Sequence, residues 1–98
     1  MTGCETTKDA LVVNPCNSEV EVRLTSRSAP PPDGKWNAVL TVPPLSAGLV
    51  KDAFVDIDDS GYTAQVTTAE GETHLLHIDR TNQRPEPVII PAEICPTP

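Results

Sequence analysis

Eleven prolines in 98 residues are the feature that most limits what this chain can fold into. Each proline lacks a backbone donor and clashes with the preceding turn of a helix, so long helices are disfavoured. No stretch carries apolar residues at the 3.6-residue spacing of an amphipathic helix. Instead, Val20, Val22 and Leu24 are separated by Glu21 and Arg23. Alternation with a period of two predicts a strand with one buried and one wet face.

Further short apolar runs, separated by turn-forming residues, predict a chain made of strands. The expected strands are residues 10–15, 19–25, 36–42, 49–57, 62–66, 73–79 and 88–90, and the expected loops include 28–35, 43–48 and 80–87. The apolar pattern of the fourth strand breaks around Asp52, which suggests a bulge. About seven short strands with regular turn signals predict an all-β domain, a β-sandwich of the immunoglobulin or fibronectin III type. We assign residues 10–96 to this domain and residues 1–9 to a flexible N-terminal tether.

The core of such a domain must be mostly aliphatic, because Trp36, Phe54 and Tyr62 are the only aromatic residues. A chain of this length buries only about two-thirds of the surface that its unfolded form exposes. We therefore expect a small stability margin.

The formal net charge of −7 restricts the possible partners. Nucleic acids and anionic membrane surfaces are bound through Lys and Arg, so neither is expected as a partner. No apolar stretch is long enough to cross a membrane. We expect a monomer without a cofactor.

Three cysteines, Cys4, Cys16 and Cys95, raise the question of pairing. In an immunoglobulin-like sandwich the first and last strands can lie side by side in parallel. Cys16 follows the first expected strand and Cys95 the last, so their downstream ends would meet and a disulfide would form. The main alternative is a buried free thiol. Zinc binding is disfavoured because no CxxC pair exists, and no base is placed to activate a catalytic cysteine.

Cys4 follows Met1-Thr2-Gly3, and small residues directly before a cysteine resemble the end of a bacterial lipobox. We interpret Cys4 as a lipidation site and Met1 as a start that replaces a signal peptide. If Met1 is the native start, a cytosolic protein is expected instead.

The segments LVVNPCNSEVEVRL, VPPLSAG and VIIPAEICP resemble small envelope lipoproteins of actinobacteria that carry an immunoglobulin-like domain. The resemblance covers about residues 10–96. It implies the sandwich fold, the disulfide and an extracytoplasmic location, with lipid anchoring or secretion. It supplies neither catalytic residues nor a ligand. Trp36 at a strand start departs from the antibody-type core, in which a tryptophan packs on the disulfide.

Residues 56–61 match the first half of an EF-hand calcium loop. The matching residues are Asp56, Asp58 and Ser60, but Thr67 stands where the bidentate Glu belongs. We interpret the segment as a hairpin turn, with a calcium site as the alternative.

His74 and His77 are three residues apart, so on a strand they point to opposite faces and cannot share a metal. One histidine is expected to be exposed and the other partly buried. No serine lies in a nucleophile elbow.

Residues 27–32 resemble a polyproline ligand, but Asp33 replaces the last proline of the motif. The stretch Pro30, Pro31, Pro32 and Asp33 is interpreted as a stiff loop and a candidate partner contact. Pro43 and Pro44 end the third strand and disfavour strand addition beside them.

Together these patterns predict a non-enzymatic cell-envelope binding or structural module whose partner is an unknown protein or envelope component. Its only membrane contact would be a lipid at Cys4, and its working surface a sheet face or the loops 28–35, 43–48 and 80–87 at one end. The alternative is an inhibitor- or chaperone-like domain that offers a loop or an edge strand.

Overall fold

The structure is a computed structural model that describes residues 7–27, 29–55, 61–81, 83 and 85–96. Within these ranges the chain forms seven β-strands and one short 3-10 helix, and no α-helix. The elements are β1 (Thr7–Asn14), β2 (Val20–Thr25), β3 (Ala38–Val42), β4 (Ser46–Val55), β5 (Gly61–Thr67), β6 (Thr73–Asp79), β7 (Glu86–Ile89) and η1 (Ala92–Ile94). The prediction of an all-β chain with about seven short strands is confirmed.

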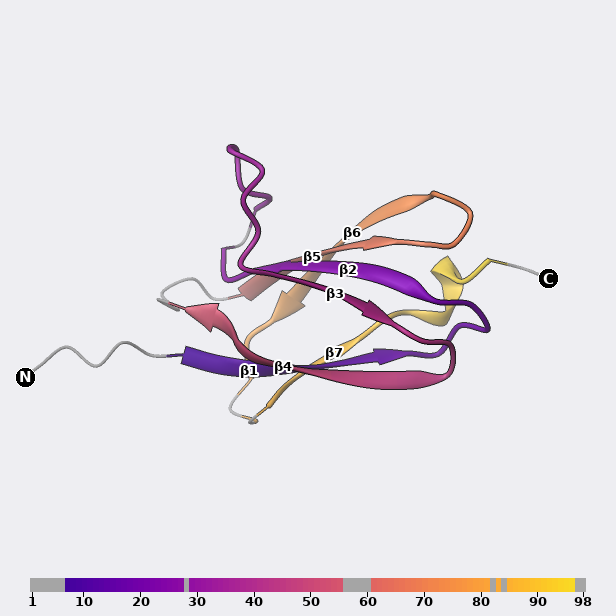
Figure 1. Cartoon of the computed structure of the whole chain (residues 1–98). Coiled ribbons are helices and arrows are strands. Elements are labelled where there is room, and N and C mark those ends of the chain that lie inside the picture. The colour runs from indigo at the N-terminus through magenta and orange to yellow at the C-terminus, as the bar shows by residue number, and fades with distance from the viewer. Residues whose placement is uncertain (1–6, 28, 56–60, 82, 84, 97–98) are drawn as a thin grey trace, which may run out of the picture.

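The strands form two sheets that pack against each other (Figure 1). One sheet has the order β4-β1-β7 and the other the order β3-β2-β5-β6. All neighbouring strands are antiparallel except β1 and β7, which are parallel. The first and last strands therefore lie side by side and point the same way, as the sequence predicted.

The core lies between the sheets and is built mainly from alternate residues of their strands. Its members are Ala10, Val12, Cys16, Val20, Val22, Leu24, Val42, Ala53, Phe54, Tyr62, Ala64, Val66, Val88 and Ile90. The rings of Phe54 and Tyr62 are stacked, with centroids 3.9 Å apart and planes 10° from parallel. Two of the three aromatic residues are thus fully buried, whereas Trp36, just before β3, is half-buried.

Four strands, β1, β4, β5 and β7, begin earlier than expected, by three, three, one and two residues. β1 starts at Thr7, so residues 7–9 of the expected tether belong to the strand. β4 starts at Ser46, because Leu45 takes a positive φ of 53° and completes the turn after Pro43 and Pro44. The loop expected at 43–48 therefore contains only residues 43–45.

The bulge expected near Asp52 is present. Asp52 has a φ of 54°, and the register between β1 and β4 shifts between Lys8 and Ala10. The Asp52 amide donates to Oδ1 of Asp9 at 2.9 Å. Because β4 has extra residues at the bulge, its alternation of inward and outward side chains is interrupted there. Ala53 and Phe54 are therefore both buried although they are adjacent.

Candidate functional site

Cys16 and Cys95 form a disulfide with a Cα–Cα distance of 5.3 Å. Val13 of β1 pairs with Ile89 of β7 in the parallel register, so the segments that follow the two strands leave the sheet at the same end. Cys16 is only 2% exposed. The pairing predicted from the parallel terminal strands is thus present in the structure.

Asn14 ties together the segments around this disulfide, and the sequence analysis did not single it out. Its Nδ2 donates to the carbonyl oxygens of Ser18, Val42 and Pro43 at 3.0, 3.2 and 3.0 Å. Its Oδ1 accepts from the Cys16 amide at 2.9 Å. One buried amide therefore satisfies four backbone groups in two chain segments, 16–18 and 42–43.

Replacing Asn14 with Ala is expected to lower the free energy of unfolding by about 2–3 kcal/mol, because buried carbonyl groups lose their donors. Urea unfolding monitored by circular dichroism measures the loss. Asn17→Ala at the neighbouring exposed position is the control, with an expected change within about 0.5 kcal/mol. Equal effects of the two substitutions would contradict the role assigned to Asn14.

A buried ion pair lies at the other end of β1. Lys8 Nζ is 2.8 Å from Glu86 Oε1, and the side chains are 5% and 0% exposed. Glu86 also accepts from the Thr81 amide at 3.1 Å and from the Thr81 hydroxyl at 2.6 Å, and Lys8 donates to the Thr81 carbonyl. Burial alone would raise the pKa of Glu86, but the hydrogen bonds from Lys8 and Thr81 outweigh it and hold the pKa below its ordinary value.

The two histidines lie as predicted, on opposite faces of β6. His77 is exposed, whereas His74 is half-buried on the side of Leu76 and Ile78. Each lies near a carboxylate of its own strand region, His74 3.9 Å from Glu72 and His77 3.5 Å from Asp79. Among the described residues no group of three or more His, Cys, Asp or Glu could hold a metal ion.

The lipidation candidate Cys4 and the calcium candidates Asp56, Asp58 and Ser60 lie outside the described residues. The described residues contain no helix that is long and apolar enough to cross a membrane.

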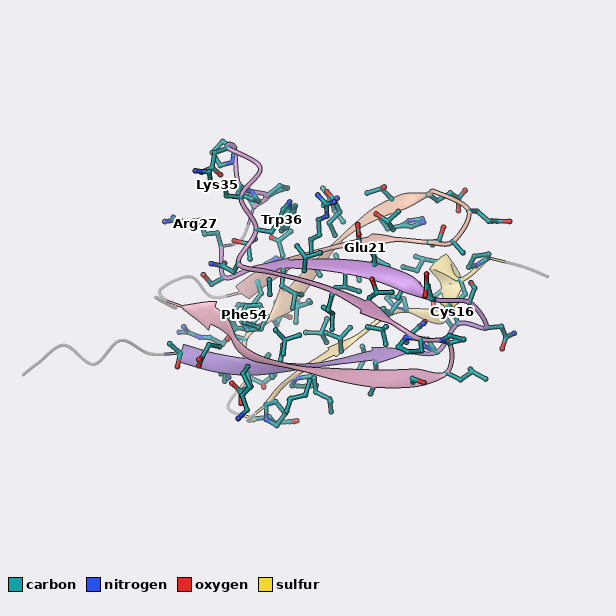
Figure 2. All side chains as sticks on the ribbon, viewed as in Figure 1. Cys16, Glu21, Arg27, Lys35, Trp36 and Phe54 are labelled. Carbon is teal, nitrogen blue, oxygen red and sulfur yellow. A yellow bond between two sulfur atoms is a disulfide. The ribbon has the colours of Figure 1, made fainter. Side chains whose placement is uncertain are left out.

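The proline loop between β2 and β3 projects from the sandwich (Figure 2). Its tip is a turn in which the Gly34 amide donates to the Pro31 carbonyl at 3.1 Å, and Gly34 has a φ of 73°. Asn37 closes the base by donating its amide to the Leu24 carbonyl and accepting from the Ser26 amide. The predicted loop is therefore present, and Lys35 lies beside its tip.

The three loops proposed as one working surface do not share an end, which corrects the sequence interpretation. The proline loop and the segment at Thr81 lie at the end where β1 begins (Figure 1). Residues 43–45 lie at the opposite end, where the Leu45 amide donates to the Cys16 carbonyl. The reason is strand direction: β3 runs from one end of the sandwich to the other, so the connections at its two ends are on opposite sides.

The outer surfaces of the two sheets differ sharply. On the three-stranded sheet, Leu11 lies between Leu49 and Pro87, and Val13 lies between Ala47 and Ile89. We call these six residues the apolar face. Leu49 is 55% and Ile89 66% exposed.

The outer surface of the four-stranded sheet is mainly polar, apart from Val39 and Leu75. Its outward residues include Glu21, Arg23, Thr41, Gln65 and Thr67. A hollow of about 220 Å³ opens there between Glu19, Glu21, Thr41 and the end of β5. Figure 2 shows Glu21 on this surface.

Comparison with protein-family models, with curated proteins and with solved structures finds no match to this chain.

Proposed function

We propose that the protein is a non-enzymatic binding module of the cell envelope that docks a protein partner on its apolar face. The observation that carries this proposal is the contrast between the two outer surfaces. A contiguous apolar surface that one sheet carries and the other lacks supports an interaction site on that sheet. In a chain whose core is thin and whose net charge is −7, apolar side chains left in water are a cost that binding would remove.

The size of the apolar face indicates the kind of interface. The apolar face consists of two rows of three side chains, each row with one residue from β4, β1 and β7, and it covers on the order of 200 Å². A stable interface buries about 800 Å² on each partner, with an apolar centre and a polar rim. The apolar face fits the centre of such an interface, and the partner should present an apolar surface of matching size.

A location outside the cytosol is part of the proposal and is supported by the disulfide, since disulfides persist in oxidising compartments. A lipid on Cys4 would anchor the module. Cys4 precedes the first residue of β1 by three positions, a span of at most about 11 Å. An anchored domain would therefore hold its proline-loop end close to the membrane and its disulfide end away from it.

The immunoglobulin-like assignment is supported by the order of the strands. The order β6-β5-β2-β3 corresponds to G-F-C-C′ of the variable-type immunoglobulin sheet, and the β4-β1 pair corresponds to E-B. β7 takes the place beside B that strand A holds in immunoglobulins, but it is parallel to its neighbour. Ala64, two residues after Tyr62 on β5, stands where antibody domains carry the second cysteine of the inter-sheet disulfide.

The test is capture of envelope proteins by the immobilised domain. A double variant, Leu49→Asp with Ile89→Asp, is expected to reduce capture of a given envelope protein at least tenfold, because charge replaces the two large exposed side chains of the apolar face. Val39→Asp is the matched control, since Val39 is 56% exposed on the other sheet. Equal capture by the wild type and the double variant would contradict the proposal.

A second candidate is an inhibitor- or chaperone-like domain that inserts the proline loop into a partner. The observation that favours it is the hydrogen-bonded turn at Pro31–Gly34 on a loop closed by Asn37. Replacing residues 30–33 with Gly and Ser in the same capture experiment separates the two candidates. Loss of capture by the loop variant alone would favour the second.

A further inference from the structure

The four-stranded sheet ends in an edge that the described chain leaves open. β6 is seven residues long and pairs with β5 on one side, and no described strand pairs with its other side. Natural proteins protect such edges with proline, bulges or lysine. β7 contains Pro87, β3 ends at Pro43 and β4 carries the bulge at Asp52, whereas β6 contains none of these devices.

The direction of the backbone groups of β6 follows from the hairpin that precedes it. The Thr68 amide donates to the Glu72 carbonyl at 2.8 Å, and antiparallel pairs alternate between bonded and non-bonded. The even-numbered residues of β6 therefore bond to β5. Thr73, Leu75, His77 and Asp79 direct their amide and carbonyl groups to the open edge.

The geometry points to a second copy of this chain as the occupant of that edge, paired antiparallel with β6 about a two-fold axis at Leu76. This register aligns all seven residues and brings the outward-directed groups opposite each other, with about eight backbone hydrogen bonds available. Leu75 then lies opposite His77 of the second copy, and Thr73 opposite Asp79. Since the pairing is symmetric and uses up both edges, it closes as a dimer and does not grow into a filament.

Charge complementarity supports this register. The residues that flank β6 are Glu72, whose side chain is 65% exposed, and Arg80, which also interacts within its own chain. The register places Glu72 opposite Arg80 of the second copy at both ends of the pairing. Opposite charges therefore meet at each end, and no like charges are directly opposed.

A hollow beside β6 offers a place for the one large apolar side chain that the pairing carries on its outer side. The hollow holds about 180 Å³ and is lined by Pro30, Thr63, Leu75, Leu76 and His77. Leu75 of the second copy, opposite His77, would lie at this hollow. Leu75 is 56% exposed in the single chain, and the pairing would cover it.

The area of one added strand is below that of a standard interface, so association should be weak. Sedimentation velocity from about 10 µM to about 1 mM is expected to show a concentration-dependent dimer. Leu75→Lys should weaken it at least tenfold, because lysine on an edge opposes pairing. Val39→Lys, with the same 56% exposure on β3, should dimerise like the wild type.

The charge pair gives an independent test. Glu72→Arg and Arg80→Glu should each weaken the dimer, and the double variant should restore it. Amide hydrogens of residues 73, 75 and 77 should exchange more slowly at high concentration. A monomer throughout the concentration range, or equal effects of Leu75→Lys and Val39→Lys, would overturn the inference.

The apolar-face variant keeps this inference distinct from the proposed function. Leu49→Asp with Ile89→Asp should dimerise like the wild type. Loss of the dimer in that variant would place the contact on the apolar face and overturn the pairing through β6, while capture of an envelope protein would test the apolar face itself.

Discussion

Replacing both Cys16 and Cys95 with Ser is expected to lower the free energy of unfolding by about 4–5 kcal/mol. The disulfide spans 79 residues, and a cross-link that closes so long a loop removes much of the conformational entropy of the unfolded chain. Small domains are stable by only about 5–15 kcal/mol in total. The variant should therefore be partly unfolded near physiological temperature, whereas the wild type is folded.

Urea unfolding of the oxidised wild type, the double serine variant and Cys4→Ser measures this effect. Cys4→Ser removes the third cysteine without touching the disulfide and should leave the midpoint unchanged. Reduction of the wild type should reproduce the double variant. A loss below about 1 kcal/mol would show that packing between β1 and β7 alone holds the ends together.

Breaking the buried ion pair is expected to have the second largest effect. Lys8→Met or Glu86→Gln should each lower the free energy of unfolding by about 3–5 kcal/mol, because each leaves a buried group without its partner. Lys8→Met combined with Glu86→Leu should recover most of the loss, since a paired apolar replacement leaves no buried charge. A double variant as unstable as the singles would show that the pair specifies the packing of β1 and is not replaceable by apolar contact.

The ion pair also predicts a pH dependence. The pKa of Glu86 is lowered by folding, so its ionised form contributes stability above the unfolded value of about 4.3, and this contribution is lost as the pH falls through the lowered pKa. The difference in unfolding free energy between the wild type and Glu86→Gln should therefore shrink below about pH 4. Urea unfolding at about pH 3 and about pH 6 measures it. A constant difference would contradict the lowered pKa.

The patterns of residues within single strands were sufficient to predict much of the fold. Alternation located β2 to within one residue, the expected strand 73–79 coincides with β6, and the broken pattern at Asp52 located the bulge. Parallel first and last strands, expected for an immunoglobulin-like sandwich, predicted the Cys16–Cys95 disulfide. The strand patterns and the bulge are local signals, because the side of a sheet that a residue occupies depends on its neighbours in sequence. The disulfide was predicted instead from the strand arrangement expected for the fold.

The candidate sites were less predictable. Lys8 was assigned to the tether because residues 1–9 are polar and lack periodicity, and Glu86 was assigned to the loop 80–87. Their burial depends on each other, since either charge alone would be unstable in the interior. Asn14 was likewise overlooked, because its three acceptor carbonyls come from segments up to 29 residues away. The proline loop was found because its turn is local.

The sequence by itself determined the strands, the alternation that separates core from surface, and the pair of cysteines that could meet. Only the tertiary structure decided that six apolar side chains from β1, β4 and β7 share one outer surface, that the loops divide between two ends, and that no strand of the described residues pairs with the outer edge of β6. The physical reason is that alternation distinguishes two faces of a strand, whereas the order of strands in a sheet decides which faces and edges are left uncovered.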